Sequence, residues 1–266
     1  MEKENQKSRV INKKTLVISV IVVLAFLIYF AIMAMFSPSR KFGILADEFS
    51  YKQDEKNKVD ERIFSDSVYL KLLKQKAWYQ SRVTMAETDS IYVTIDLPDS
   101  VVNLEISGVT VHKADIGKIN ISKILRQGNN YVISSLLSKP FTIRSDFSSI
   151  EKEPLMIKMA PKDTSEYQPD IMPDTADYEP VNFIMELDYG IRIHIYQFEK
   201  LNPGDRMHLF MFDLRYRFRD TLESMKSIFT FRIPEYHPFI KIRLPRNDVK
   251  IIYRALPEKG QVAVYS

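Results

Sequence analysis

The hydrophobic pattern begins with one long apolar stretch. Residues 15–36 carry no charged side chain and consist mainly of Val, Ile, Leu, Ala and Phe. As an α-helix this stretch would be about 33 Å long at ~1.5 Å per residue, which is enough to cross the hydrocarbon core of a bilayer. A helix buried in a soluble core seldom runs so far without one charge. The pattern therefore predicts a single transmembrane helix over residues 15–36.

The far end of the apolar stretch bears on whether it is retained or cleaved. A secretory signal peptide has an apolar core of about 7–15 residues, followed by small residues at its cleavage site. Residues 31–36 read Ala-Ile-Met-Ala-Met-Phe and make a poor site of that kind. A retained signal-anchor is therefore favoured over a cleaved signal peptide. Pro38 is expected to end the helix, because proline cannot continue the hydrogen-bonded ladder.

Residues 37–89 are expected to form a juxtamembrane helical region. Its first part, up to residue 62, is polar and mixed in charge, as in a tether or a solvated helix. Ser65, Asp66 and Ser67 are good helix caps, and apolar residues follow them at intervals of three and four. A second helix is therefore predicted there. Trp78, the only tryptophan, is interpreted as a packing residue rather than a ligand platform.

From residue 90 onward the period of the pattern changes to two. Apolar and polar positions alternate in short runs separated by turn residues, which is typical of strands that bury one face. Strands are predicted at residues 91–97, 102–106, 109–111, 131–133, 141–143, 155–159, 183–187, 191–195, 209–218, 229–233, 240–244 and 262–264. Residues 90–266 are therefore expected to form a mainly β domain, either a β-sandwich or a mixed barrel, with few helices.

Two segments of this domain depart from the alternation. Residues 160–181 hold four prolines and six acidic residues against one lysine, and proline breaks both helices and β-ladders. An acidic, proline-rich loop is expected there, either a solvated linker or a functional element. Asn247 and Asp248 are expected to cap a short helix that runs to Leu256 and buries Val249 and Ile252.

Charge indicates which end of the chain stays in the cytoplasm. The net charge is +4, and residues 1–14 hold five basic and two acidic side chains, so most of the excess lies in this tail. Fewer basic residues, Arg40 and Lys41, closely follow the apolar stretch. This bias predicts a cytoplasmic tail over residues 1–14 and an exported chain from residue 37 onward. The nearly neutral remainder argues against nucleic acid as a partner.

The composition excludes several kinds of chemistry. The chain contains no cysteine, which excludes disulfides, thiolate zinc sites, iron–sulfur clusters and any cysteine nucleophile. The four histidines are His112, His194, His208 and His237, and none of them is spaced as in a helical or strand metal site. Neither a glycine-rich phosphate loop nor a Gly-x-Ser-x-Gly turn is present. No metal ion and no cofactor are therefore expected.

Three segments resemble the catalytic domain of the L,D-transpeptidase family. Residues 179–194, which read Glu-Pro-Val-Asn-Phe-Ile-Met-Glu-Leu-Asp-Tyr-Gly-Ile-Arg-Ile-His, are similar to the strand that carries that family's active-site histidine, at the position of His194. Residues 242–253 are similar to the segment that follows the family's Ser-His-Gly-Cys run, and residues 90–111 to its opening strand and hairpin. The resemblance implies an L,D-transpeptidase-like fold in the envelope of a bacterium.

The departures from the family pattern decide what the resemblance can mean. When the chain is aligned on Arg243, residues 238–241 stand in place of Ser-His-Gly-Cys, with Lys241 at the nucleophile and Phe239 at the second histidine. The family's mechanism needs a thiolate that attacks a peptide carbonyl, and this chain has no thiol. What is left is a candidate ligand groove around His194, His237 and Lys241. Its other two members, Arg192 and Arg243, are candidates to hold a peptide carboxylate.

The resulting expectation is a non-catalytic protein of the bacterial inner membrane. It would cross the membrane once through residues 15–36 and hold its domain in the periplasm. There, an L,D-transpeptidase-like pseudoenzyme domain would serve as an adaptor or binding module for an envelope protein or for peptidoglycan. The alternative is an envelope hydrolase or transferase that uses His194 and His237 without cysteine.

Overall fold

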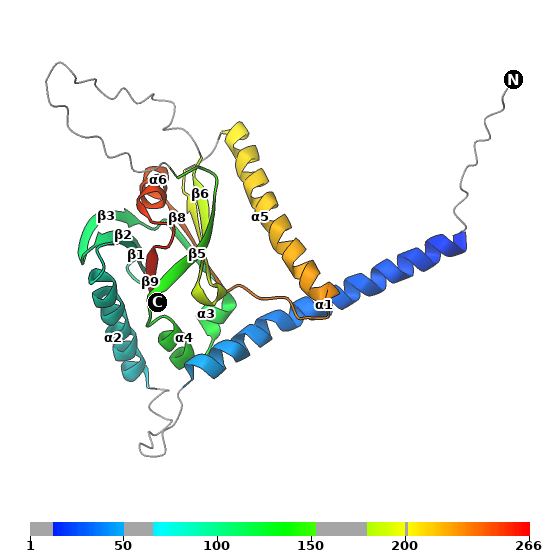
Figure 1. Cartoon of the computed structure of the whole chain (residues 1–266), viewed down its shortest axis with the longest axis horizontal. Helices are drawn as coiled ribbons and strands as arrows, with labels where there is room; N and C mark the ends of the chain where they lie inside the picture. The colour runs from blue at the N-terminus through cyan, green and yellow to red at the C-terminus, as the bar shows by residue number, and fades with distance from the viewer. Residues whose placement is uncertain (1–12, 51–65, 153–179, 200–201) are drawn as a thin grey trace, which may run out of the picture.

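A mixed β-sheet lies at the centre of the protein, and long helices surround it (Figure 1). The computed structural model of the chain describes residues 13–50, 66–152, 180–199 and 202–266. The helices in this part are α1 (Lys13–Phe49), α2 (Ser67–Ala86), α3 (Lys123–Gln127), α4 (Asn130–Leu136), α5 (Pro203–Phe229) and α6 (Arg246–Ala255). The strands are β1 (Ile91–Asp96), β2 (Val101–Ile106), β3 (Val109–Asp115), β4 (Lys118–Ile121), β5 (Phe141–Ser148), β6 (Asn182–Leu187), β7 (Arg192–Gln197), β8 (Phe239–Leu244) and β9 (Gln261–Tyr265). The strand predicted at 155–159 and the acidic loop up to residue 179 lie outside the described residues.

The nine described strands form one sheet in the order β3-β2-β1-β9-β5-β6-β7-β8-β4. The pairs β1–β9 and β7–β8 are parallel, and the other pairs are antiparallel. Strands β3 and β4 lie at opposite edges of this order, yet only Ile116 and Gly117 separate them in the chain. The sheet must therefore curl enough to bring the linked ends of β3 and β4 close together. The predicted mainly β class of this domain is confirmed, and the more specific sandwich or barrel of L,D-transpeptidase-like type stays a prediction.

The concave side of the curled sheet holds the main hydrophobic core. Alternate residues of β7 and β8 point into it, among them Ile193, Ile195 and Ile242, which are fully buried. The buried face of α6, which includes Val249 and Ile252, closes one side as the sequence predicted, although Pro245 is the N-cap and not Asn247 or Asp248. Since inward residues occupy every second position, the outward residues of β7 and β8 share the opposite face.

Helix α1 does not end at Pro38, which corrects the sequence prediction. It continues to Phe49, and its contact face repeats every three or four residues from Phe26 onward. The Ser37 hydroxyl donates a hydrogen bond to the carbonyl of Pro234 at 2.8 Å, and Leu45 and Phe49 are buried in the main core. A proline inside a helix costs about 3 kcal/mol, and burial of this face offsets that cost. The apolar N-terminal part of α1 and the part that packs in the domain thus form one continuous helix.

The first part of α1 carries its apolar side chains on the outside of the protein. Residues such as Leu16, Val20 and Leu24 are more than half exposed, and the rest of the described chain leaves them uncovered. α1 is long and apolar enough to span a membrane, and no other helix among the described residues meets both conditions. In Figure 1 this part of α1 projects away from the sheet.

Two predicted strands are helical in the structure. The run at 131–133 belongs to α4, where the Asn129 side chain accepts hydrogen bonds from the backbone of Tyr131 and Val132. A run of three residues is too short to distinguish a strand from a helix. The run at 209–218 belongs to α5, which begins with Asn202 as N-cap and Pro203 in its first turn. The strand predicted at 229–233 is also wrong, because α5 ends at Phe229 and an irregular segment follows.

Helix α2 agrees with the prediction more closely. It begins after Asp66, whose side chain accepts a hydrogen bond from the Val68 amide at 2.7 Å. Trp78 is buried and lies against the Tyr265 ring, with 5.5 Å between ring centroids. The tryptophan therefore packs α2 onto β9, in agreement with its interpretation as a packing residue.

Candidate functional site

The candidate groove residues from the sequence come together on the outer face of β7 and β8. Neighbouring parallel strands need a crossover connection, and α5 provides it here by running between β7 and β8 across that face. In the register of the pair, His194 lies opposite Lys241, and Tyr196 lies opposite Arg243. Because of this crossover, α5 covers the face on which the resemblance locates the family's chemistry.

Arg192 is the most enclosed charged member of this group. Its side chain is 7% exposed and forms ion pairs with Glu186 at 3.1 Å and with Asp220 of α5 at 2.7 Å. Burial lowers the pKa of Arg192, but the hydrogen bond to Asp220 and the nearby negative charges outweigh it, so its pKa is raised. Arg192 thus joins α5 to the sheet, and its charge is already matched by two carboxylates.

The His194 ring is surrounded by aromatic side chains. Tyr196 stacks beside it, and Tyr216 of α5 and Phe239 of β8 approach it edge-on, with centroids 5.7 and 6.0 Å away. Burial, together with the charges of Lys241 and Arg192, lowers the pKa of His194 to about 4, although Asp220 opposes this effect. At neutral pH the imidazole is therefore uncharged.

Lys241, at the position where the resemblance expects the nucleophile, lies over an aromatic ring. Its Nζ is 4.0 Å from the centroid of the Tyr196 ring, within the range of a cation–π contact. The Tyr196 hydroxyl donates a hydrogen bond to Asp213 of α5 at 2.7 Å. Burial lowers the pKa of Lys241, and neighbouring Arg243 adds to this effect, while Asp213 opposes it. Arg243 itself is exposed and lies at the end of the group.

His237 reaches the same region from the segment before β8. Its Nδ1 lies 3.0 Å from the carbonyl oxygen of Gly190, and its ring lines a pocket of about 340 Å³ together with Arg192 and His194. We call this the histidine pocket. Phe30, Ala34 and Ser37 of α1 form another part of its wall, so the pocket opens beside the apolar helix.

A further ion pair, between Lys41 and Glu235, joins the rim of the histidine pocket to α1. Lys41 Nζ lies 2.7 Å from Glu235 Oε1, and the lysine side chain is only 8% exposed. Burial raises the pKa of Glu235, but the hydrogen bond and the charge of Lys41 outweigh this, so its pKa lies below the ordinary value. The carboxylate is therefore charged at neutral pH and ties the segment before β8 to α1.

The chemistry available in the histidine pocket is limited. Among the described residues there is no group of three His, Asp or Glu side chains that could hold a metal ion. A neutral His194 could accept a proton, and the hydroxyl groups of Ser37, Tyr216, Ser224 and Tyr236 line the same pocket. Burial raises the pKa of both tyrosines, and the Ser37 hydroxyl already donates a hydrogen bond to the Pro234 carbonyl. Ile195 points into the core and leaves the pocket open, whereas Phe239 lines it. The pocket offers polar and aromatic contacts together with two histidine rings.

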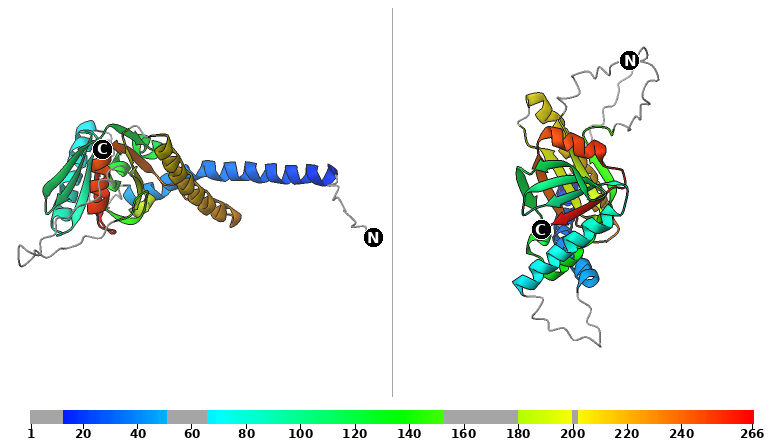
Figure 2. Two further views of the ribbon diagram at one scale, coloured as in Figure 1. Left: turned by 90° about the horizontal axis from the view of Figure 1, so that it is seen from above. Right: turned by 90° about the vertical axis from the view of Figure 1, so that its left-hand side faces the viewer.

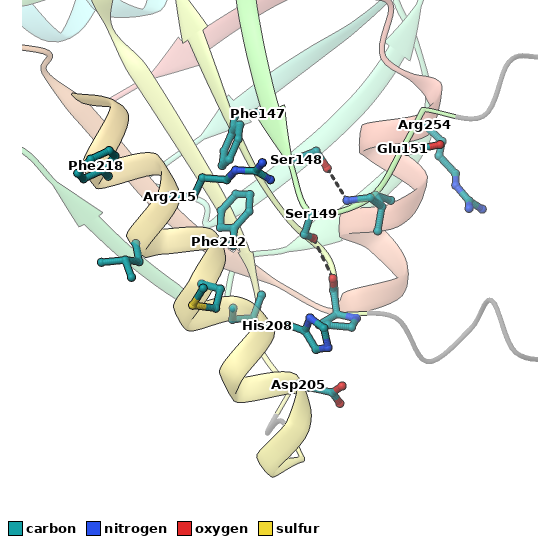
Figure 3. A pocket seen from close by; sticks show the side chains of 15 residues that line it. Phe147, Ser148, Ser149, Glu151, Asp205, His208, Phe212, Arg215, Phe218 and Arg254 are labelled. Atoms are coloured by element: carbon teal, nitrogen blue, oxygen red, sulfur yellow. Dashed lines mark hydrogen bonds between the residues drawn. The ribbon is translucent and has the colours of Figure 1, made fainter. Parts of the chain in front are cut away.

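A larger groove, which the sequence did not predict, lies on the other side of α5. It has a volume of about 1370 Å³ and runs between α5 and the end of β5 (Figure 3). Phe212 stacks on Phe147 at 4.8 Å within it, and His208 and Asp205 lie toward its end. The sequence carries a signal for this helix, since apolar residues of 205–218 recur at helical spacing as well as alternating.

Comparison with known protein families and with curated proteins finds no match for this chain. The site is therefore interpreted from its own geometry and from the resemblance of short segments.

Proposed function

We propose that this chain is a membrane-anchored, non-catalytic protein of the bacterial cell envelope. In this proposal α1 crosses the inner membrane, the N-terminus is cytoplasmic, and an L,D-transpeptidase-like domain lies in the periplasm. The domain acts as an adaptor or binding module for an envelope protein or for peptidoglycan.

The observation that carries this proposal is the state of the outer β7–β8 face. Lys241, which stands where the family's nucleophile would be, is held against the Tyr196 ring. Tyr216 of α5 covers His194 from the side. Lys241 held in this way supports ligand binding in the neighbouring histidine pocket better than acyl transfer at Lys241, because a nucleophile needs open space for the tetrahedral intermediate. The absence of cysteine from the sequence excludes the thiolate route independently.

One feature favours the enzyme alternative and keeps it testable. His194 and His237 line the same pocket, and a pair of histidines can serve as general acid and base. This alternative requires that both rings contribute to turnover.

The test uses the full chain in detergent micelles. Wild-type protein and the variants His194→Ala and His237→Ala are incubated with peptidoglycan stem-peptide fragments, and the products are followed by mass spectrometry. The proposal expects no turnover by any of the three proteins. Turnover by the wild type that either variant abolishes would establish the enzyme alternative.

A binding experiment then tests the positive half of the proposal. A photo-crosslinking residue at position 236, on the rim of the histidine pocket, is compared with one at Val109, which is 64% exposed on β3. An adduct with peptidoglycan fragments or with one membrane protein, formed at 236 and not at 109, is the expected result. Equal or absent crosslinking at both positions contradicts a binding role for this pocket.

A further inference from the structure

The exposed side of α5 carries an apolar stripe along most of its length. Its residues follow one another at intervals of three or four, as on one face of a helix. The stripe consists of Met207, Met211, Leu214, Phe218, Leu222, Met225 and Phe229. All of these except the half-buried Met225 are between 48% and 63% exposed. Patches of this size on a surface usually mark an interaction site.

The position of α5 shows what the stripe faces. Phe212 and Tyr216 of α5 pack on the sheet, so the stripe points away from the sheet. In Figure 1 and Figure 2 α5 lies on the side of the sheet toward the N-terminal part of α1, and it runs across the direction of α1 rather than alongside it. A helix that crosses a membrane-spanning helix steeply runs nearly parallel to the plane of the bilayer. The stripe of α5 then faces the lipid.

The end of α5 reaches the apolar part of α1. The Phe229 ring stacks on the Phe26 ring with 5.3 Å between the ring centroids. The centroids of the Phe231 and Tyr29 rings are 6.3 Å apart. The chain then follows α1 outward to the hydrogen bond between Ser37 and Pro234. From residue 26 to residue 37 a helix rises about 16 Å, close to half of the ~30 Å hydrocarbon core. Phe231, 82% exposed, is thus at the depth of lipid if residues 15–36 span the membrane.

The charges on α5 are arranged to suit a membrane surface. Two of its acidic residues, Asp213 and Asp220, turn inward to Tyr196 and Arg192. The exposed positions beside the stripe include three basic residues, Arg215, Arg217 and Lys226. Basic residues flanking an apolar face are typical of helices that lie in the interface of anionic membranes.

We propose that α5 is a second membrane contact of this protein. Its apolar stripe faces the acyl chains of the bilayer that α1 enters, with Phe229 beside Phe26 at the deepest point, and its basic flanks face anionic headgroups. The proposal rests on the membrane-spanning role of α1 in the proposed function. The spacing of the stripe would also suit pairing with a second copy of the helix. The bilayer is favoured because Phe229 and Phe231 contact α1 within its apolar stretch, where a water-soluble partner has no access.

The absence of cysteine makes the test direct, because each variant then carries a single thiol. Phe218→Cys reports on the stripe, Leu24→Cys on α1, and Val109→Cys on β3, and all three native residues are more than half exposed. The full chain is spin-labelled at each position and reconstituted into vesicles of phosphatidylethanolamine and phosphatidylglycerol. Accessibility of the label to oxygen, which concentrates in lipid, is compared with its accessibility to a water-soluble nickel chelate.

The expected result is that the labels at 24 and 218 are more accessible to oxygen than to the chelate, and that the order is reversed at 109. Vesicles without phosphatidylglycerol should reduce the oxygen preference at 218 and leave it unchanged at 24. A label at 218 that behaves as at 109, while 24 remains in lipid, overturns the α5 proposal alone. A label at 24 in water overturns the span itself. Spin–spin broadening at 218 indicates pairing of two copies and also overturns the lipid contact.

Discussion

At the scale of single residues, charge balance and aromatic contacts determine the state of the side chains on the outer face of β7 and β8. Arg192 has its two carboxylates, Lys241 has the Tyr196 ring, and His194 is neutral because its surroundings are apolar and positively charged. None of these states could be deduced from residue type alone. Each depends on Asp213, Tyr216 or Asp220, which lie on α5, the helix that connects β7 and β8 across this face.

The lowered pKa of His194 predicts a pH dependence of stability. The ordinary pKa of histidine is 6.5, and that of folded His194 is about 4, so between these values the unfolded chain binds a proton that the folded chain does not. Stability is therefore lost as pH falls from 6.5 toward 4. Between about pH 7 and about pH 5 the wild type should lose about 1–2 kcal/mol more than His194→Gln.

Denaturant unfolding of the full chain in micelles, followed by Trp78 fluorescence, measures this difference. His208→Gln, at an exposed position on α5, is the matched control and should follow the wild type. If His194→Gln and the wild type respond to pH in parallel, the histidine is not buried as described.

At the scale of elements, α1 shows how tertiary contacts override a local signal. Proline usually ends a helix, yet α1 passes through Pro38 because residues on both sides of it are packed against the domain. The part of α1 that follows Pro38 thus belongs to the hydrophobic core and is not a tether.

Two adjacent residues of α1 test this interpretation. Leu45 is 1% exposed in the main core, whereas Ile44 is 49% exposed. Leu45→Ala should lower the free energy of unfolding by about 2–4 kcal/mol, because it leaves a cavity in the core. Ile44→Ala should change it by less than ~0.5 kcal/mol. Equal effects in the same unfolding assay would mean that this part of α1 does not pack on the domain.

The same elements show how far the sequence could predict the structure. Strands with clear alternation, such as those around Ile193 and Ile242, were predicted correctly because one of their faces is buried. The α5 region was predicted as a strand because it is apolar on two sides, one against the sheet and one exposed, and both periods fit such a pattern. The register of β7 and β8 brings their candidate residues side by side, but the sequence pattern does not predict the helix that covers them.

At the scale of the whole molecule, the orientation of the chain across the membrane is open to direct measurement. The basic residues before the apolar stretch predict that residue 8 is cytoplasmic and that Val109 is outside. The variants Ser8→Cys and Val109→Cys are treated with a membrane-impermeant maleimide in cells whose outer membrane has been permeabilised. Labelling at 109 before lysis, and at 8 only after lysis, is the expected outcome. The reverse order would place the domain in the cytoplasm and remove the envelope proposal.

The unbroken course of α1 through Pro38 also has a mechanical consequence. The orientation of a domain on a flexible linker is independent of the tilt of the membrane helix, whereas a domain fused to a stiff helix turns with that helix. The tilt of a spanning helix responds to hydrocarbon thickness, because a longer apolar stretch tilts more in a thinner bilayer. Where α1 crosses a membrane, a change in hydrocarbon thickness that tilts α1 would therefore also turn the domain that is packed on its second half.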